Sequence, residues 1–384
     1  MAALLGSLWL GAADYGHYML LASTAALCAG VGQLGVQSVV TRDMARACGA
    51  ERADRSSTSV LLICAVTGLV STGFVVLVHA GLALPQVLIA ESHRLWLLVP
   101  WSVSIAINNQ SVAILMGVHD FPRASWLAAS RGLLIGILVS AAAISGGVLL
   151  TVAVTVVAEC CIAGASLLVL SKARLLALRV SRQYLNRLVR IGMGAGVASI
   201  LIQIVSWCAQ TYLAAQDGGL VELGVFSLGS RLGLLASLIA STIVSTLLPF
   251  MSRNRGAIGY RLGVLAPTAI SLAFGTVAIA AMLLLIPLWP SEYGERVGVL
   301  IVMVLVAIAS VMNVSVGSMA VARGSIRLWV WSDVLLAAIL GSLGLLLITS
   351  WGALGLSVSH LSAFVGSSVF LITGMELGRT RERL

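Results

Sequence analysis

One long apolar run constrains this chain more than any other stretch. Val225–Phe250 contains 26 residues and a single charge, Arg231, and a run of this length crosses a bilayer as an α-helix. Because a lipid-facing Arg is costly, we expect Arg231 to face a helical bundle or a wet cavity. On a helical wheel it shares an arc of roughly 120° with Ser227, Ser230, Ser237, Ser241 and Ser245. Two other interpretations stay open, in which Arg231 snorkels to the near interface or forms a structural ion pair.

The composition predicts a membrane protein. Hydrophobic residues make up 59% of the chain, charged residues 10%, and the mean hydropathy is +1.06, whereas soluble proteins carry about a quarter charged residues. The net charge of +9 requires no nucleic-acid partner, because basic loops beside anionic inner-leaflet lipid account for it. The six Cys form no CxxC motif or Cys/His cluster, so we expect neither a metal nor another cofactor.

Hydropathy along the chain predicts an all-α polytopic protein with about 11 full transmembrane helices. An apolar stub, Met1–Ala13, precedes them and is too short to span. Either the first helix begins upstream of Met1, or the stub dips into the bilayer without crossing. The predicted spans are Tyr18–Val40, Ser59–Leu84, Leu95–Met116, Ala124–Ser145, Val148–Leu170, Ile191–Tyr212, Val225–Phe250, Leu262–Leu288, Val297–Ala320, Leu328–Ser350 and Ala353–Gly374.

The links between these spans differ sharply in charge. Of the basic residues in the links, only Arg94 and Arg296 fall on one side of the membrane. The positive-inside rule makes the other side cytoplasmic, including the C-terminus. We therefore expect a multi-pass protein of the bacterial cytoplasmic (inner) membrane.

The longest link is basic and lies near the middle of the chain. Its leucines suggest a helix lying on the inner membrane surface, and we expect residues 171–190 to join an N-terminal bundle (1–170) to a C-terminal bundle (191–384). A weak internal repeat supports two halves, because Tyr15-Gly16-His17-Tyr18 and Leu223-Gly224-Val225-Phe226 each open a span that ends before an Arg. Repeated halves are a common transporter plan.

Several segments resemble a known family. LLGSLWLGAADYGHYML, LGVQSVVTRDMAR, QSVAILMGVHDFPRASWL and the segment around Arg231 are similar to polysaccharide-biosynthesis flippases of the O-antigen and exopolysaccharide type. These belong to the multidrug/oligosaccharidyl-lipid/polysaccharide exporter superfamily. The resemblance implies two six-helix bundles around a central cavity, and transport of an undecaprenyl-pyrophosphate-linked oligosaccharide. The first helix departs from that pattern, and the family's seventh-helix Asp is replaced near Cys208, Ala209 and Gln210, so no coupling role is carried over from it.

Few charged residues fall inside the predicted spans. Arg side chains suit pyrophosphate oxygens, and the candidates for substrate binding are Arg231, Arg131 and, at the headgroup level, Arg42. Glu159 is a candidate proton site or partner for a buried Arg, and Asp333 is a candidate for coupling or for an interfacial ion pair. Intramembrane amides can hydrogen-bond a glycan or hold helices together; they are Asn108, Asn109, Gln110, Gln203, Gln210 and Asn313.

Alternative functions remain. A cation-coupled multidrug antiporter of the same superfamily would favour an acidic cavity. A membrane enzyme, such as a polysaccharide polymerase or ligase, would need catalytic residues on a sizeable outer loop, and the predicted outer links are short. The chain has no GxxxxGK[ST] motif for ATP. We therefore expect a transporter that hands its product to polymerase or ligase machinery, and not an enzyme.

Overall fold

A computed structural model describes residues 2–33, 35–79, 92–177, 180–233, 264–285, 291–322 and 325–383. Within these ranges every regular element is helical, which confirms the predicted fold class. The chain forms two compact units. Unit 1 contains Met1–Leu10 and Tyr18–Trp207, and unit 2 contains Gly11–His17 and Cys208–Leu384.

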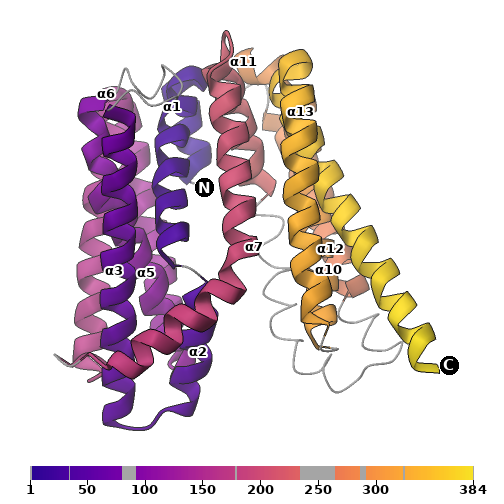
Figure 1. The fold of residues 1–384 in the computed structure, drawn as a ribbon. Coiled ribbons are helices and arrows are strands. Elements are labelled where there is room, and N and C mark those ends of the chain that lie inside the picture. Colours follow the sequence, from indigo (N-terminus) through magenta and orange to yellow (C-terminus); the bar gives the residue numbers. More distant parts are fainter. Residues whose placement is uncertain are drawn as a thin grey trace. The chain divides into compact units, whose positions relative to one another are not determined.

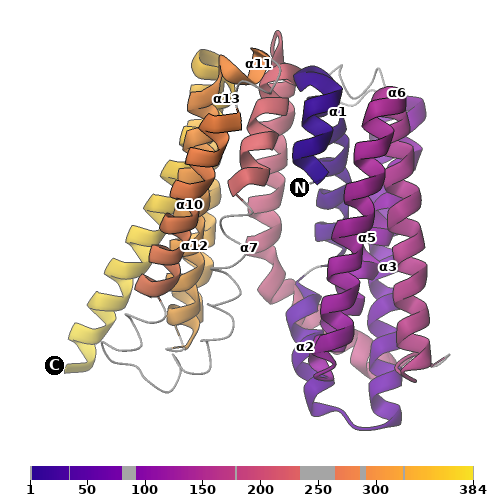
Figure 2. The same cartoon turned by 180° about the vertical axis from the view of Figure 1, so that it is seen from behind.

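The helices of unit 1 are α1 (Ala2–Gln33), α2 (Val36–Arg46), α3 (Ala50–His79), the short 3-10 helix η1 (Ser92–Leu97), α5 (Leu98–Gly117), α6 (Phe121–Lys172) and α7 (Arg182–Ala214). In unit 1, α3, α5 and the two halves of α6 run side by side (Figure 1). Unit 2 takes the part of α1 from Gly11 to His17 and the end of α7. It adds a helical segment over residues 219–233, α10 (Ala266–Leu285), α11 (Ser291–Gly294), α12 (Val297–Ala322) and α13 (Ile326–Arg383) (Figure 2).

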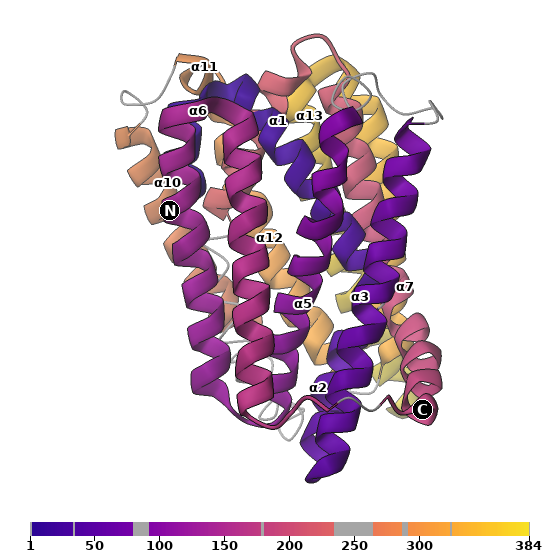
Figure 3. The same cartoon turned by 90° about the vertical axis from the view of Figure 1, so that its left-hand side faces the viewer.

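Two of the long helices are hairpins that turn at a glycine. Gly147 interrupts α6 at φ 68° and ψ −164°, and Gly352 interrupts α13 at φ 54° and ψ −129°. Side chains with a Cβ rarely adopt these angles, so glycine permits each reversal. Figure 3 shows the two antiparallel halves of α6 lying together. The predicted pairs of spans on either side of these glycines are confirmed.

Seven of the described helices are long and apolar enough to cross a membrane. They include both hairpins and the predicted spans that begin near Ser59, Leu95, Ile191, Leu262 and Val297. The predicted N-terminal stub is confirmed, because α1 is interrupted at Gly11 (φ 72°, ψ 164°) in the same way as the two hairpins. The predicted span Tyr18–Val40 was wrong at its end: α1 stops at Gln33, and the chain breaks around Gly35, where φ is 67° and α2 begins. Most of the predicted span Val225–Phe250 lies outside the described residues.

The basic link is helical only in its second half, from Arg182 to Arg190. Residues 173–177 and 180–181 are not helical, and the next helix begins at Arg182. Leu175, Tyr184 and Leu188 are buried in the core of unit 1. The apolar face of the link therefore packs against protein, because the ends of α2 and α3 already offer an apolar surface there.

The two glycines of the internal repeat lie where helices of unit 2 approach closely. A Cβ on Gly16 would come 1.9 Å from the Leu220 carbonyl oxygen, and one on Gly224 would come 2.0 Å from the Ala12 carbonyl oxygen. Both obstacles are backbone atoms, which cannot move aside as a side chain can. The first part of α1 and the segment 219–233 thus pack backbone to backbone, as small residues allow in membranes.

This contact predicts that Gly224→Ala destabilises the protein. Overpacking of a tight contact costs about 1–3 kcal/mol, so the apparent Tm in detergent micelles should fall by several degrees. Gly164→Ala is the matched control, because a Cβ at that helical position meets no atom within 4 Å. Equal Tm values for the two variants would contradict the close packing.

Candidate functional site

Arg131 and Glu159 lie on opposite halves of the α6 hairpin. Arg131 is ten residues from the start of α6 at Phe121, which places it roughly 15 Å along the helix at 1.5 Å per residue. Both belong to the predicted spans on either side of Gly147, and both lie inside the span that the structure supports. The hairpin therefore brings a cation and an anion together within the apolar part of the bundle.

The two side chains form a salt bridge with several contacts. Arg131 Nη2 donates to Glu159 Oε1 at 2.7 Å, and Arg131 Nε lies 3.0 Å from Oε2 and 3.1 Å from Oε1. The Glu159 side chain is 4% exposed and that of Arg131 is 25% exposed. Planar guanidinium and carboxylate groups are suited to such paired contacts. Of the two sequence interpretations for Glu159, the structure forms the ion pair.

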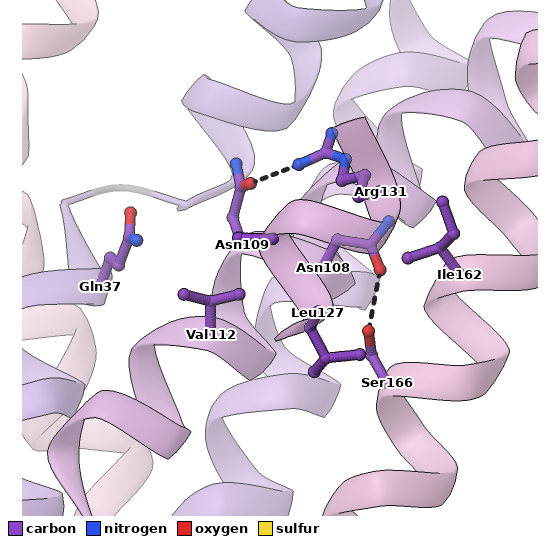
Figure 4. A pocket seen from close by; sticks show the side chains of 9 residues that line it. Gln37, Asn108, Asn109, Val112, Leu127, Arg131, Ile162 and Ser166 are labelled. Carbon is purple, nitrogen blue, oxygen red and sulfur yellow. Dashed lines mark hydrogen bonds between the residues drawn. The ribbon is translucent and has the colours of Figure 1, made fainter. Parts of the chain in front are cut away.

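Amides of α5 complete the network around this pair. Asn108 Nδ2 donates to Glu159 Oε2 at 2.8 Å, and Arg131 Nη1 donates to Asn109 Oδ1 at 3.0 Å. Ser166 Oγ then donates to Asn108 Oδ1 at 3.1 Å. Figure 4 shows the Arg131–Asn109 and Asn108–Ser166 bonds converging from α5 and the two halves of α6. The buried charges are thereby hydrogen-bonded, as buried polar groups need to be.

A cavity of about 180 Å³ opens beside this network. Its polar lining comes from Gln37, Asn108, Asn109, Arg131 and Ser166, and its apolar lining includes Val112 and Leu127. In Figure 4, Gln37 stands apart from the others and faces them. Because Glu159 neutralises Arg131, this cavity offers hydrogen-bonding groups with little net charge.

Arg231 is placed in unit 2 and is exposed. The helix that carries it begins near residue 219, earlier than predicted, so Arg231 lies roughly 18 Å along the axis at 1.5 Å per residue. Gly229 and Gly233 lie against α12, and Arg231 is about 200° from each at 100° per residue. Arg231 therefore points away from α12, on the face that carries Gly224. Among the described residues it forms no ion pair.

The serine stripe predicted beside Arg231 is only partly described. Ser227 is buried and Ser230 is partly exposed, whereas Ser237, Ser241 and Ser245 lie outside the described residues. The stripe as a whole therefore remains a prediction.

Arg42 and Asp333 are not among the residues that line the cavity. Arg42 is half-exposed at the end of α2, where its Nε is 3.5 Å from the neighbouring Asp43 Oδ1. Asp333 is buried in α13, and within the described part of the chain its carboxylate has no ion pair or hydrogen bond. The structure thus unites Arg131 with Glu159 and leaves Arg42 and Asp333 in other surroundings.

Ser166 and Gln37 were not singled out from the sequence. Isolated Ser and Gln residues are common in helices, and only their position on the facing helices connects them to Asn108 or to the cavity. One signal was available for Asn108. It precedes Gly147 by the same number of residues as Asn313 precedes Gly352, and Asn313 donates to Ser367 Oγ, in the second half of α13, at 2.8 Å. In each unit, an Asn of the preceding helix thus bonds to the second half of the hairpin.

No metal-binding group is formed by the described residues. Within those ranges, no three His, Cys, Asp or Glu side chains gather closely enough to hold an ion.

Comparison with known proteins gives one family and one fold. The family described as "Polysaccharide biosynthesis protein" matches residues 7–255. A search of curated proteins returns no match.

Three solved structures illustrate the shared fold. The lipid II flippase MurJ in an inward closed conformation has a TM-score of 0.76 at 13% identity, over 98% of this chain and 86% of that chain. An inward-facing multidrug resistance MATE family transporter of the MOP superfamily has 0.68 at 14% identity, over 99% and 93%. A MOP superfamily transporter from Pyrococcus furiosus, whose binding pocket is described as reversed in polarity, has 0.62 at 15% identity, over 99% and 91%. The chain therefore has the fold of these transporters.

The paired charges predict a strongly non-additive response to substitution. Glu159→Ala leaves the Arg131 charge uncompensated and should cost about 3 kcal/mol of unfolding free energy, measured by SDS titration. The double variant Arg131→Leu/Glu159→Leu should recover most of this loss, because it removes both charges.

Arg123→Ala is the control for this cycle. It breaks an exposed ion pair with Asp120 at 2.9 Å, which contributes less than about 1 kcal/mol. If Glu159→Ala costs no more than this control, or if the double variant is no more stable than Glu159→Ala, the pair does not stabilise the bundle as described.

Proposed function

The chain belongs to the polysaccharide biosynthesis protein family, and on that premise we propose that it moves an undecaprenyl-pyrophosphate-linked oligosaccharide across the cytoplasmic membrane. The observation that supports this most directly is the neutral, hydrogen-bonding cavity beside Arg131 and Glu159 within an apolar helical unit. A hydrophilic glycan needs such a lining, because unpaired polar groups are costly in hydrocarbon.

The cavity suits the glycan part of the cargo. Sugar hydroxyls both donate and accept hydrogen bonds, and the amide side chains of residues such as Asn109 and Gln37 can accept from or donate to them. A free cation at this place would carry a large desolvation cost, whereas the Arg131–Glu159 pair is already compensated. We therefore propose that the Arg131–Glu159 pair maintains the polar lining of the cavity. The exposed edge of Arg131 would contact the glycan.

The pyrophosphate requires positive charge, and we assign that role to Arg231. Its guanidinium is exposed and forms no ion pair among the described residues, so it is available to phosphate oxygens, which it can bind in a two-pronged geometry. Its position, roughly 18 Å along the helix axis, supports a site away from the headgroup level. Arg42 lies near the end of α2, outside the supported spans, where it would meet phospholipid headgroups rather than the pyrophosphate.

A multidrug antiporter is the alternative within the same superfamily. Recognition of cationic drugs favours an acidic cavity, but the carboxylate beside this cavity is bound to Arg131 through both oxygens. Arg231 adds a further cation. The charges of the described residues thus favour an anionic cargo, and the transporter fold supports transport over an enzymatic reaction.

Coupling to an ion gradient is best assigned to Asp333. A buried carboxylate in a membrane helix is a functional candidate by default, and Asp333 has no partner cation among the described residues. Glu159, by contrast, is committed to Arg131. We further propose the inner membrane as the site of action, with the C-terminus in the cytoplasm, and delivery of the product to polymerase or ligase machinery.

Deletion of the gene should cause an undecaprenyl-linked oligosaccharide to accumulate, because the cargo no longer leaves the inner leaflet. Extraction and mass analysis of lipid-linked glycans measures it. The intact gene should reverse the accumulation, Arg231→Ala should not, and Arg231→Lys should do so only in part, since it keeps the charge but loses the planar fork.

Arg123→Ala serves as the control for expression and for a general loss of positive charge, and it should complement fully. No accumulation after deletion, with surface polysaccharide unchanged, would contradict the flippase and favour the drug antiporter.

Asp333→Asn should remove the dependence of transport on an imposed ion gradient in proteoliposomes while leaving cargo binding intact. The assignment is wrong if transport by this variant still responds to the gradient as the unmodified protein does.

A further inference from the structure

A second charged cluster lies at the end of unit 1, where α2, the start of α3 and the start of α7 meet. Its centre is Asp43, whose side chain is 1% exposed. Arg187 Nη2 lies 3.3 Å from Asp43 Oδ1, and Arg42 Nε lies 3.5 Å from the same oxygen. Two guanidinium groups from different helices thus converge on one carboxylate oxygen.

The start of α7 is docked firmly at this place. The backbone N–H of Ala177 donates to Ser57 Oγ at 2.7 Å, and that of Ser181 donates to Thr58 Oγ1 at 2.9 Å. Arg55 Cζ lies 5.4 Å from the centre of the Tyr184 ring. Arg42 and Arg187 are therefore held on a fixed surface and do not hang from a loose loop.

The cluster carries more positive than negative charge. Arg42 and Arg187 pair with the Asp43 carboxylate, whereas Arg55 donates to the Asp43 backbone carbonyl at 3.2 Å and forms its ion pair with Glu51. Three guanidinium groups thus face two carboxylates. Burial and, next, the Asp43 carboxylate raise the pKa of Tyr184, so its hydroxyl stays neutral. The Arg42 and Arg187 side chains are 48% and 46% exposed. A net positive, solvent-facing pair of guanidinium groups therefore remains after internal pairing.

We propose that Arg42 and Arg187 form a binding site for the phosphate of an anionic phospholipid, which bridges α2 and α7. A phosphodiester has two free oxygens and can accept from both guanidinium groups at once. The phosphate would share the two guanidinium groups with the Asp43 carboxylate, because the cluster carries an excess of positive charge. Within unit 1, the site would clamp the start of α7 to α2.

Position favours a phospholipid as the occupant. Neither Arg42 nor Arg187 lies inside a helix stretch apolar enough to span; the supported span of α7 begins only at Gly196. The cluster therefore lies at the level of headgroups, where anionic lipid attracts basic residues. This inference requires only that the protein is embedded in the membrane, and it does not depend on the identity of the cargo.

Native mass spectrometry of the purified full-length protein in detergent tests the site, with dioleoyl phosphatidylglycerol as the probe. The variant Arg42→Gln/Arg187→Gln should bind the first phosphatidylglycerol about tenfold more weakly, as expected for the loss of charge-assisted bonds. Arg123→Gln/Lys172→Gln removes two exposed charges from the ends of α6 and should stay within about twofold.

Asp43→Asn gives a prediction of opposite sign. It removes the competing carboxylate, so phosphatidylglycerol affinity should rise, whereas a merely structural role for Asp43 would lower Tm without raising affinity. Equal losses in the two double variants would overturn the site. So would displacement of the lipid by millimolar inorganic phosphate, or a clear preference for undecaprenyl pyrophosphate over phosphatidylglycerol.

Discussion

The ion pair between Arg131 and Glu159 is the interaction on which the polar interior of unit 1 depends. Neither charge is tolerable alone among apolar helices, and together they form a compensated group whose remaining hydrogen bonds are taken by Asn108 and Asn109. The pair also joins the two halves of α6 to each other and to α5. A cavity beside it can then be polar without being strongly charged, which is the condition that a glycan places on a path through a membrane.

The two units use the same construction with different contents. In each, a hairpin that turns at a glycine follows a helix with an Asn at the same distance before that glycine, and this Asn bonds to the second half of the hairpin. Unit 1 adds the Arg131–Glu159 pair. Unit 2 instead has Asp333 buried in its hairpin and the exposed Arg231 on a separate helix. The repeated construction provides the scaffold. The residues that differ between the halves take the proposed roles: Arg131 contacts the glycan, Arg231 binds the pyrophosphate and Asp333 couples transport to an ion gradient.

Sequence reasoning predicted the helices well because their apolar runs are long and their turns are marked by Gly147 and Gly352. It failed where the packing of one helix against another decides which surface a side chain faces. The leucines of the link could face lipid or protein, and only the neighbouring helices show that Leu175 and Leu188 face protein. Similarly, Glu159 could be recognised as a candidate partner for an Arg, but its pairing with Arg131 depends on the register of the hairpin. The break at Gly11 agrees with the expected stub, whereas the break at Gly35 was not predicted, because a single glycine inside an apolar run does not by itself mark the end of a helix.

Translocation by the purified protein in proteoliposomes is the most direct test of the central claim. The cargo would be an undecaprenyl-pyrophosphate oligosaccharide with a fluorescent sugar, and the variants would be Arg131→Glu, Glu159→Arg and the exchanged pair. We expect the unmodified protein to move the glycan, each single reversal to abolish transport, and the exchanged pair to restore a substantial part of it. Undiminished transport in the single reversals, or none in the unmodified protein, would contradict the account.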